Sequence, residues 1–248
     1  MSAPGARRAH LPLPPPHPTG AESIWLHAPA RPLEAVEPLV QPDERLIMAH
    51  DPCDPRCEKI RALRTELLLR RDSPDRADII ALLSPCSGEG RSLLAAELAI
   101  AFAQTGHPTL LVDADLRRPQ QHVLFGARNR HGLAQAIARG DTPQVQSVHG
   151  LPRMSLLTAG VVPGDPLELL SSRRFAELIE GWRDEYEFVV LDTAPVGRFS
   201  DGLAVARLVG RVLALSRAQH TPRKDMQDML RRLTATRSQT LGAVVSHF

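Results

Sequence analysis

Hydrophobic residues from position 77 onward gather in short uninterrupted runs, separated by longer segments in which apolar positions recur with a helical period. Runs that are apolar on both faces are typical of strands buried inside a parallel sheet. Such runs cover residues 77–84, 108–115, 153–160, 187–195, 211–218 and 240–248. We predict that each of them forms a strand.

The segments before and between these runs have the apolar spacing and the end signals of helices. They cover residues 57–71, 91–106, 132–141, 165–186, 200–210 and 222–237. Strands that alternate with helices along a chain pack as a parallel sheet with helices on both faces. The sequence therefore predicts an α/β fold with a doubly wound, mostly parallel sheet. In such folds, ligands bind beyond the carboxyl ends of the strands.

The beginning of the chain has a different composition. Residues 1–40 contain nine of the 22 prolines, and such a segment buries too little apolar surface to offset the entropy lost on ordering. We predict a proline-rich disordered arm over residues 1–45 and one domain over residues 46–248.

Charge, cysteine content and hydropathy argue against several classes of protein. The formal net charge of +2 is too small to indicate a nucleic-acid partner. Three cysteines in 248 residues are typical of a reducing compartment rather than a disulfide scaffold. No apolar run approaches the ~20 residues of a membrane-spanning helix or resembles the core of a signal peptide. We expect a cytoplasmic protein that neither inserts into a membrane nor binds nucleic acid.

Residues 84–99, SPCSGEGRSLLAAELA, connect the first predicted strand to a helix through a turn of small residues. The free N–H groups and the dipole at a helix start favour phosphate. Gly88 and Gly90 allow close approach to the backbone, and Ser92 holds the position of a Mg²⁺-binding hydroxyl. Two usual features of a phosphate-binding loop are missing, because Pro85 replaces its first glycine and Arg91 replaces its lysine.

Acidic residues end two of the buried strands. Asp113 and Asp115 share a face because they are two residues apart, and Asp192 ends the apolar run FVVL. Carboxylates in such places need a balancing cation. Since Mg²⁺ in nucleotide sites takes one or two carboxylates plus phosphate oxygens, Ser92, Asp192 and one aspartate of the pair form a candidate Mg²⁺ site.

The motifs VDADLRRP and FVVLDTAP and the GEG-containing loop resemble those of the bacterial tyrosine kinases (BY-kinases). These kinases belong to the deviant-Walker P-loop ATPases, together with MinD and ParA. The resemblance runs from about residue 46 to residue 248. RRPQQHVLFG, NRHGLAQAIARGD, LTAGVVPGDPLELL and LGAVVSHF are similar to the exopolysaccharide branch, the chain-length-determinant kinases of the EpsG type.

The resemblance implies a non-specific protein-tyrosine kinase that uses ATP and Mg²⁺ and regulates exopolysaccharide synthesis or export. Asp113 and Asp115 would form the second Walker motif of the family, one assisting Mg²⁺ and one accepting the tyrosine hydroxyl proton. Asp192 would be the Walker B carboxylate, so that Mg²⁺ is held by Ser92, Asp115 and Asp192, while Arg91 acts with the aspartate pair in catalysis. The loop would contact the nucleotide through Ser87, Gly88, Glu89, Gly90, Arg91, Ser92 and Leu93.

The resemblance also implies partners. Glu58, Arg61 and Arg64 match the E-x-x-R-x-x-R helix that forms subunit contacts in the rings of the family, so a homo-oligomer is expected. Arg117 and Asp201 match a basic residue after the aspartate pair and an acidic residue after the Walker B loop. A transmembrane chain-length-determinant protein, a polysaccharide co-polymerase, would recruit the chain to the inner face of the plasma membrane.

The sequence departs from the family pattern at three places. Arg91 keeps the positive charge of the P-loop lysine but is a wider, planar group. The C-terminal tyrosine cluster of the family is missing and Tyr186 is the only tyrosine, which implies a substrate tyrosine on another protein. Ser246 stands where an asparagine is expected to bind adenine, and it makes fewer hydrogen bonds than an amide.

Three functions are compatible with these residues. The first is a protein-tyrosine kinase or slow ATPase, favoured by the retained Ser92 and aspartates. The second is a non-catalytic, nucleotide-gated regulator of a membrane polysaccharide co-polymerase, favoured by Arg91 and the missing tyrosines. The third is a positioning ATPase similar to MinD and ParA, which would need a membrane-targeting helix or a DNA-binding surface. We favour the first, then the second.

Overall fold

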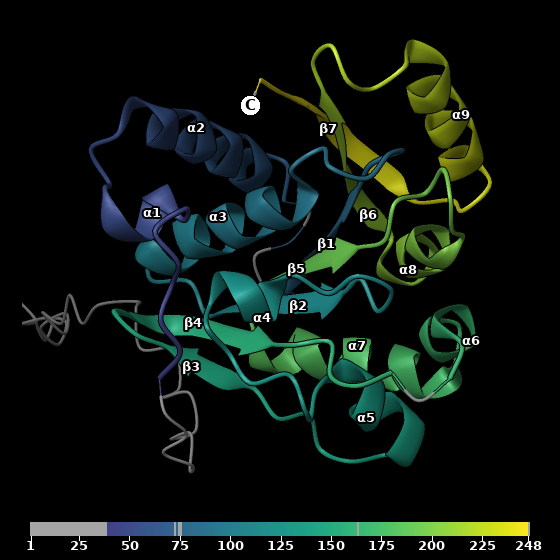
Figure 1. The fold of residues 1–248 in the computed structure, drawn as a ribbon, viewed down its shortest axis with the longest axis horizontal. Helices are drawn as coiled ribbons and strands as arrows, with labels where there is room; N and C mark the ends of the chain where they lie inside the picture. Colours follow the sequence, from purple (N-terminus) through teal and green to yellow (C-terminus); the bar gives the residue numbers. More distant parts are fainter. Residues whose placement is uncertain (1–38, 72, 74–75, 163, 248) are drawn as a thin grey trace, which may run out of the picture. The chain divides into compact units, whose positions relative to one another are not determined.

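The computed structural model describes residues 39–71, 73, 76–162 and 164–247. Within these residues, the centre is a seven-stranded sheet in the order β3-β4-β2-β5-β1-β6-β7 (Figure 1). Its strands are β1 (Asp78–Leu83), β2 (Thr109–Ala114), β3 (Gln146–Val148), β4 (Leu151–Leu157), β5 (Phe188–Thr193), β6 (Arg211–Arg217) and β7 (Gln239–Ser246). The prediction of a doubly wound, mostly parallel sheet is confirmed.

The pairing of strands brings the candidate site together. β1 lies between β5 and β6, and β2 pairs in parallel with β5, so that Asp113 stands opposite Asp192. β3 runs antiparallel to β4. This strand was not predicted, because a strand of three residues is too short to show an apolar pattern.

Helices cover both faces of the sheet (Figure 1). The helices that pack with the first core cluster are α1 (Ile47–His50), α2 (Pro55–Leu69), α3 (Arg91–Gln104) and α4 (Gln121–Leu124). The helices that pack with the second core cluster are α5 (Leu133–Arg139), α6 (Pro166–Leu170), α7 (Arg173–Glu185), α8 (Asp201–Val209) and α9 (Arg223–Thr234). Along β1, Ile79 and Leu83 enter the second cluster and Ile80 and Leu82 the first, so the strand is buried on both faces as its sequence indicates.

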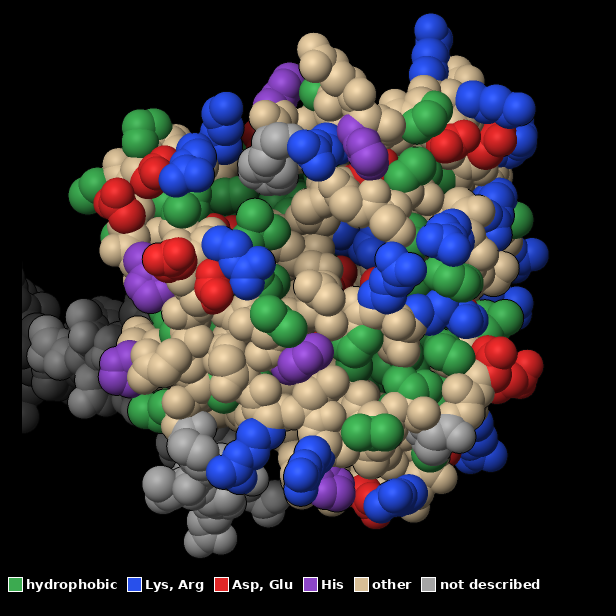
Figure 2. All heavy atoms as spheres, viewed as in Figure 1, with side chains coloured by type: hydrophobic (Ala, Val, Ile, Leu, Met, Phe, Trp, Pro, Cys, Tyr) green, Lys and Arg blue, Asp and Glu red, His purple; other side chains and the backbone are tan. Residues whose placement is uncertain are grey.

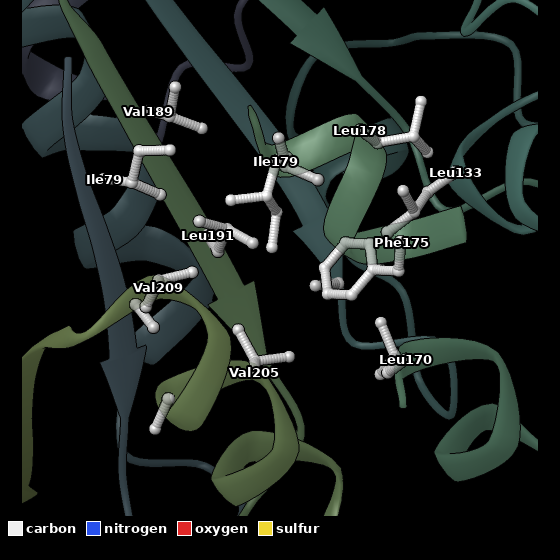
Figure 3. Packing of buried hydrophobic residues seen from close by; sticks show 14 of the residues in the cluster. Ile79, Leu133, Leu170, Phe175, Leu178, Ile179, Val189, Leu191, Val205 and Val209 are labelled. Atoms are coloured by element: carbon white, nitrogen blue, oxygen red, sulfur yellow. The ribbon is translucent and has the colours of Figure 1, made fainter. Parts of the chain in front are cut away.

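The second core cluster fixes β5 from one side. Figure 3 shows Ile179 of α7 and Val205 and Val209 of α8 around Leu191 of β5. All four side chains are buried, and burial of such side chains supplies most of the stabilisation of a fold. The end of β5, which carries Asp192, is therefore held in position by well-packed side chains.

The segment predicted as one helix over residues 165–186 is instead two helices, α6 and α7, and the prediction of a single helix is wrong there. Ser172 starts α7 by accepting a hydrogen bond from the N–H of Phe175 at 3.3 Å, and Asp165 starts α6 by accepting one from Leu167 at 2.8 Å. Serine and aspartate are favoured as first caps because they satisfy the free N–H groups. The helices α1 and α4, of four residues each, were not predicted.

Residues 39–45, which the sequence assigns to the arm, contact the domain. Val40 is buried and forms a bridge with Val148, and the N–H of Asp43 donates to the carbonyl of Leu124 at 2.8 Å. Residues 1–38 lie outside the described residues, so the disordered arm stays a prediction. Within the described part of the chain, no helix is long and apolar enough to cross a membrane.

Candidate functional site

The loop between β1 and α3 forms one wall of a cavity of about 360 Å³. Gly88 and Gly90 have φ angles of 78° and 86°, which side chains other than glycine rarely allow. The first turn of α3, with its free N–H groups, adjoins this wall. Every loop residue predicted to contact the nucleotide lies in the wall: Ser87, Gly88, Glu89, Gly90, Arg91, Ser92 and Leu93.

The loops that follow β2 and β5 form the opposite wall. Its residues are Asp115, Arg117, Arg118, Gln120, Pro195, Arg198 and Phe199. Arg117 donates to the buried carboxylate of Asp201, with 2.5 Å between Nε and Oδ2, and its guanidinium lies 4.2 Å from the ring centre of Phe199. Figure 2 shows many Lys and Arg side chains on the right-hand part of the molecular surface in this view.

Asp113 is fully buried and is not among the residues that line the cavity. Its Oδ2 accepts hydrogen bonds from the N–H groups of Gln120 and Gln121 at 3.0 and 2.9 Å. Burial raises the pKa of Asp113 well above its usual value, and the nearby Asp192 raises it further. Asp113 therefore holds the loop after β2 in place, behind the cavity.

Asp115 faces the cavity instead. Its Oδ1 accepts hydrogen bonds from the N–H groups of Arg117 and Arg118 at 3.2 and 2.9 Å. These bonds fix the carboxylate and leave Oδ2 toward Arg91. Of the predicted pair, Asp115 is thus the carboxylate that a bound molecule could contact.

The guanidinium of Arg91 lies between two carboxylates. Its Nη2 is 3.4 Å from Asp115 Oδ2, its Nε is 3.4 Å from Asp192 Oδ1, and Nη1 donates to the hydroxyl of Ser84. The side chains are 7%, 5% and 0% exposed for Arg91, Asp115 and Asp192. The residue predicted to bind phosphate therefore pairs here with both carboxylates predicted to bind Mg²⁺.

Gln121 is a site residue that the sequence did not reveal. Its side-chain Nε2 donates to Asp192 Oδ2 at 2.9 Å and to the carbonyl of Ser92 at 3.0 Å. The side chain is buried, and it links the end of β5 to the start of α3. Gln121 lies in RRPQQHVLFG, a segment that resembles the family, but the resemblance assigned this residue no role, so only the fold reveals its contacts.

The oxygen atoms present suit Mg²⁺. Ser92 lines the cavity, and its hydroxyl helps to lower the pKa of Asp192, which burial raises overall. Asp192 Oδ1 is buried and has no hydrogen-bond partner among the described residues. Hard oxygen donors of this kind are what Mg²⁺ prefers. Within the described residues, no group of three or more His, Cys, Asp or Glu is arranged to hold a metal ion.

The C-terminal part of the chain holds the loop from outside. The carbonyls of Ser87 and Gly88 accept hydrogen bonds from His220 and Arg217, both at 3.1 Å, and the carboxylate of Glu89 accepts one from Thr221. The Oγ of Ser246 also donates to the carbonyl of Glu89 at 3.2 Å. Within the loop, the N–H of Cys86 donates to Glu89 Oε2 at 2.7 Å. Ser246, predicted to bind adenine, braces the loop and is not among the cavity residues.

Tyr186, the only tyrosine in the sequence, is partly buried. Tyr186 packs against the second core cluster, and burial raises the pKa of its hydroxyl. A hydroxyl in this position is poorly placed to be phosphorylated by another molecule.

The three charged residues of α2 do not form one exposed row. Arg61 pairs with Glu58, which is 72% exposed, whereas Arg64 donates to the carbonyl of Ala101 in α3 at 3.0 Å. Burial lowers the pKa of Arg64. Glu58 is thus open to a partner while Arg64 joins α2 to α3, and the predicted subunit contact stays a prediction.

Comparison with known proteins identifies the family of this chain. No protein-family model matches it. The tyrosine-protein kinase YwqD of Bacillus subtilis is 33% identical over 192 residues, which cover 76% of this chain and 80% of YwqD. The chain belongs to the bacterial tyrosine kinase family. CapB of Staphylococcus aureus is 29% identical over 191 residues, or 83% of its length.

Solved structures of bacterial tyrosine kinases agree with this assignment. The chimerical protein CapA2B2 has a TM-score of 0.77 at 31% identity and covers 85% of this chain and 93% of its own. The kinase domain of Escherichia coli ETK has a TM-score of 0.76 at 31% identity, over 82% of this chain and 79% of its own. The cell division ATPase MinD of Pyrococcus furiosus, at 20% identity and a TM-score of 0.59 over 68% of this chain and 71% of its own, shares the fold.

Relatives of the family differ in length. The chain matches the tyrosine-protein kinase etk of Escherichia coli K12 at 32% identity over 197 residues, which are 79% of this chain but 27% of etk. It therefore spans about a quarter of the longer relatives and most of YwqD and CapB.

Proposed function

We propose that this chain is an ATP- and Mg²⁺-dependent protein-tyrosine kinase that regulates exopolysaccharide synthesis or export, as in the EpsG-type branch. The observation that carries the proposal is the cavity that is lined by both the phosphate-binding loop and Asp115, and whose lining residue Arg91 pairs with Asp192. Membership of a family whose relatives are named tyrosine-protein kinases supports it.

The roles of the residues follow from their positions. The N–H groups of the loop and the first turn of α3 bind the phosphates of ATP. Ser92, Asp115 and Asp192 hold Mg²⁺, which neutralises phosphate charge when bound. Asp115 lies at the cavity surface and is the aspartate of the pair that we assign to Mg²⁺.

We propose that the substrate tyrosine belongs to another protein, because Tyr186, the only tyrosine in the sequence, is partly buried and packs against the second core cluster. A transmembrane chain-length-determinant protein is the partner that we propose, and it recruits the kinase to the inner face of the plasma membrane. The solved structure of the chimerical protein CapA2B2, to which this chain is similar, supports such a partnership, because the name of the chimera combines CapA and CapB. Self-association through Glu58 and Arg61 belongs to the same proposal.

The position of Arg91 favours a second candidate function. A guanidinium paired with both Asp115 and Asp192 occupies the carboxylates that phosphoryl transfer needs. If it stays there when ATP binds, the chain is a nucleotide-gated regulator of the same membrane partner, without phosphoryl transfer.

Transfer of labelled phosphate separates the two functions. The full chain is incubated with Mg²⁺, labelled ATP and the cytoplasmic segment of the membrane partner, and phosphotyrosine is measured. The kinase function predicts transfer that Asp192→Asn abolishes and that Asp184→Asn, an exposed aspartate of α7, leaves intact. ATP binding without transfer, with transfer appearing only in Arg91→Lys, would establish the regulator. A chain that binds no ATP contradicts both.

A further inference from the structure

Asp115 and Asp192 each use one carboxylate oxygen for hydrogen bonds and leave the other toward Arg91. Asp115 Oδ1 accepts two backbone N–H groups, and Asp192 Oδ2 accepts the amide of Gln121. The remaining oxygens, Asp115 Oδ2 and Asp192 Oδ1, each lie 3.4 Å from a guanidinium nitrogen. The two oxygens that a metal ion could use are therefore the two that face Arg91.

Arg91 donates a close hydrogen bond to Ser84, whereas its contacts with the two carboxylates are mainly electrostatic. All three side chains are buried, so the attraction between opposite charges is little screened. The contacts of 3.4 Å are long for charge-assisted hydrogen bonds, and the Nε of Arg91 has no hydrogen-bond partner among the described residues. A group that offers better-placed acceptors can therefore draw the guanidinium away.

We propose that Arg91 is the resident cation of the Asp115–Asp192 pair in the nucleotide-free chain, so that the site accepts a divalent cation together with a nucleotide and rejects the free cation. The inference rests on the proposed nucleotide-binding function. Phosphate oxygens match the planar fork of a guanidinium, and the start of α3 attracts them to the same cavity wall. When Arg91 turns to the phosphates, Asp115 Oδ2 and Asp192 Oδ1 become available to the metal.

An arginine suits this role better than the lysine usual in such loops. Its three guanidinium nitrogens contact Asp192, Asp115 and Ser84 separately, whereas an ammonium is a single compact charge. Arg91→Lys should therefore neutralise the two carboxylates less completely. We expect its affinity for a divalent cation to lie between that of the native chain and that of the neutral variant Arg91→Gln.

Binding of Mn²⁺, a paramagnetic substitute for Mg²⁺, tests the proposal without turnover. Electron paramagnetic resonance follows Mn²⁺ titrated into the nucleotide-free full chain. The native chain should show no saturable binding, and Arg91→Gln should bind Mn²⁺ at least about tenfold more tightly, because two buried carboxylates lose their nearby cation. Arg118→Gln is the matched control, since Arg118 lines the same cavity, is exposed and has no ion pair among the described residues. It should bind Mn²⁺ no better than the native chain.

Two further arms keep the test decisive. Arg91→Gln combined with Asp192→Asn should lose the gain in Mn²⁺ affinity. If Arg91→Gln does not fold, Mn²⁺ is titrated into the native chain with and without ADP, and saturable binding is expected only with ADP. The proposal is overturned if the native chain binds Mn²⁺ equally well with and without ADP, or if it binds Mn²⁺ as tightly as Arg91→Gln does.

The outcomes also separate this inference from the kinase function. A chain with the expected Mn²⁺ behaviour but no phosphoryl transfer contradicts the kinase function alone. A chain that transfers phosphate yet binds free Mn²⁺ as well as Arg91→Gln does contradicts the role of Arg91 alone.

Discussion

At the scale of single residues, Gln121 connects three parts of the candidate site: Asp113, Asp192 and Ser92. Its side chain reaches Asp192 and the carbonyl of Ser92, and its backbone N–H donates to Asp113 at 2.9 Å. One residue thus connects both acidic motifs with the start of α3. Such a link depends on the packing of β2 against β5, and it leaves no pattern in the sequence.

Gln121→Met keeps the length of the side chain and removes its two hydrogen bonds. Because the carboxylate of Asp192 then loses its orientation, we expect kcat for tyrosine phosphorylation to fall about 10- to 100-fold, with little change in KM for the protein substrate. The unfolding free energy should fall by about 1–3 kcal/mol, since buried acceptors lose a donor. Urea unfolding and steady-state kinetics measure the two effects.

The matched control is Gln120→Met. Gln120 is exposed, and the hydrogen bond described for its side chain goes to the carbonyl of Pro119. Equal losses of kcat in both variants would show that Gln121 does not orient Asp192.

Cys86 lies in the phosphate-binding loop, but its thiol is expected to be unreactive. Burial, together with the nearby Glu89 and Asp225, raises the pKa of this thiol to about 11. At pH 8 only on the order of one thiol in a thousand is then ionised, and the thiolate is the reactive form. We expect iodoacetamide at pH 8 to modify the exposed Cys53 well before Cys86, as measured by mass spectrometry of tryptic peptides.

The same reaction has a definite pH dependence. Since the thiolate of Cys86 forms only as the pH approaches its raised pKa, its modification should accelerate with each step in pH up to 10. Asp225→Asn removes a neighbouring negative charge and should make Cys86 react faster at pH 8. Modification of Cys86 at the rate of Cys53 in the native chain would contradict the raised pKa.

Motifs predicted the positions of the loop and the aspartates, but not the contacts they make. The succession of strands and helices along the chain and the glycines of the loop follow from local patterns. The order of the strands in the sheet, which puts β2 beside β5 and so Asp113 opposite Asp192, was not predicted. Whether a long arginine side chain points to the cavity or to the carboxylates depends on competing partners, such as Ser84. The sequence pattern does not predict which of these partners the guanidinium of Arg91 contacts.

At the scale of elements, long periodic segments were predictable and short ones were not. The helices that became α3, α8 and α9 and all the long strands were predicted, because their buried positions recur regularly. α1, α4 and β3 have three or four residues each, and such short elements exist through distant contacts.

The helix α1 shows such a distant contact. Glu97 of α3 is buried, and its two carboxylate oxygens accept the N–H groups of Ile47 and Met48 at 2.8 and 3.0 Å. Free N–H groups at a helix start are normally satisfied by a residue next to them in sequence. Here the acceptor comes from 50 and 49 residues further along the chain, so no local capping signal predicts the helix.

Glu97→Ala should therefore destabilise α1. Two buried N–H groups lose their acceptor, at a cost of about 2–4 kcal/mol in unfolding free energy, and the amides of Ile47 and Met48 should exchange with deuterium much faster. Glu97→Gln keeps one oxygen acceptor and should recover about half of the loss. Glu66→Ala, a change at an exposed glutamate of α2, is the control; a similar loss there would mean that α1 does not depend on Glu97.

At the scale of the whole molecule, the C-terminal end of the domain lies against the phosphate-binding loop. The turn after β6 and the end of β7 hold the loop through bonds that span 129 to 157 residues of sequence. The sequence predicted both the loop and the closing strand. It did not predict that Ser246 binds the carbonyl of Glu89, because that contact needs β7 to lie beside β6 at the edge of the sheet.

Thr221 tests whether this bracing matters for nucleotide binding. Its hydroxyl donates to Glu89 and accepts the N–H of Arg217 at 2.8 Å. Thr221→Val has nearly the same shape and lacks both bonds, so the loop should sample more conformations. We expect ATP affinity to fall about tenfold, or ~1.4 kcal/mol, and the amides of Gly88 and Gly90 to exchange faster with deuterium, while the amides within α9 keep their protection.

Thr240→Val supplies the matched control, because Thr240 is an exposed residue of β7, away from the loop. Calorimetric titration with ATP and hydrogen exchange on both variants distinguish the possibilities. If Thr221→Val frees the loop amides but binds ATP as tightly as Thr240→Val, phosphate itself orders the loop on binding. If exchange and affinity change together, the C-terminal half of the sheet holds the loop in its binding conformation before the nucleotide arrives, because a loop already ordered loses less entropy on binding.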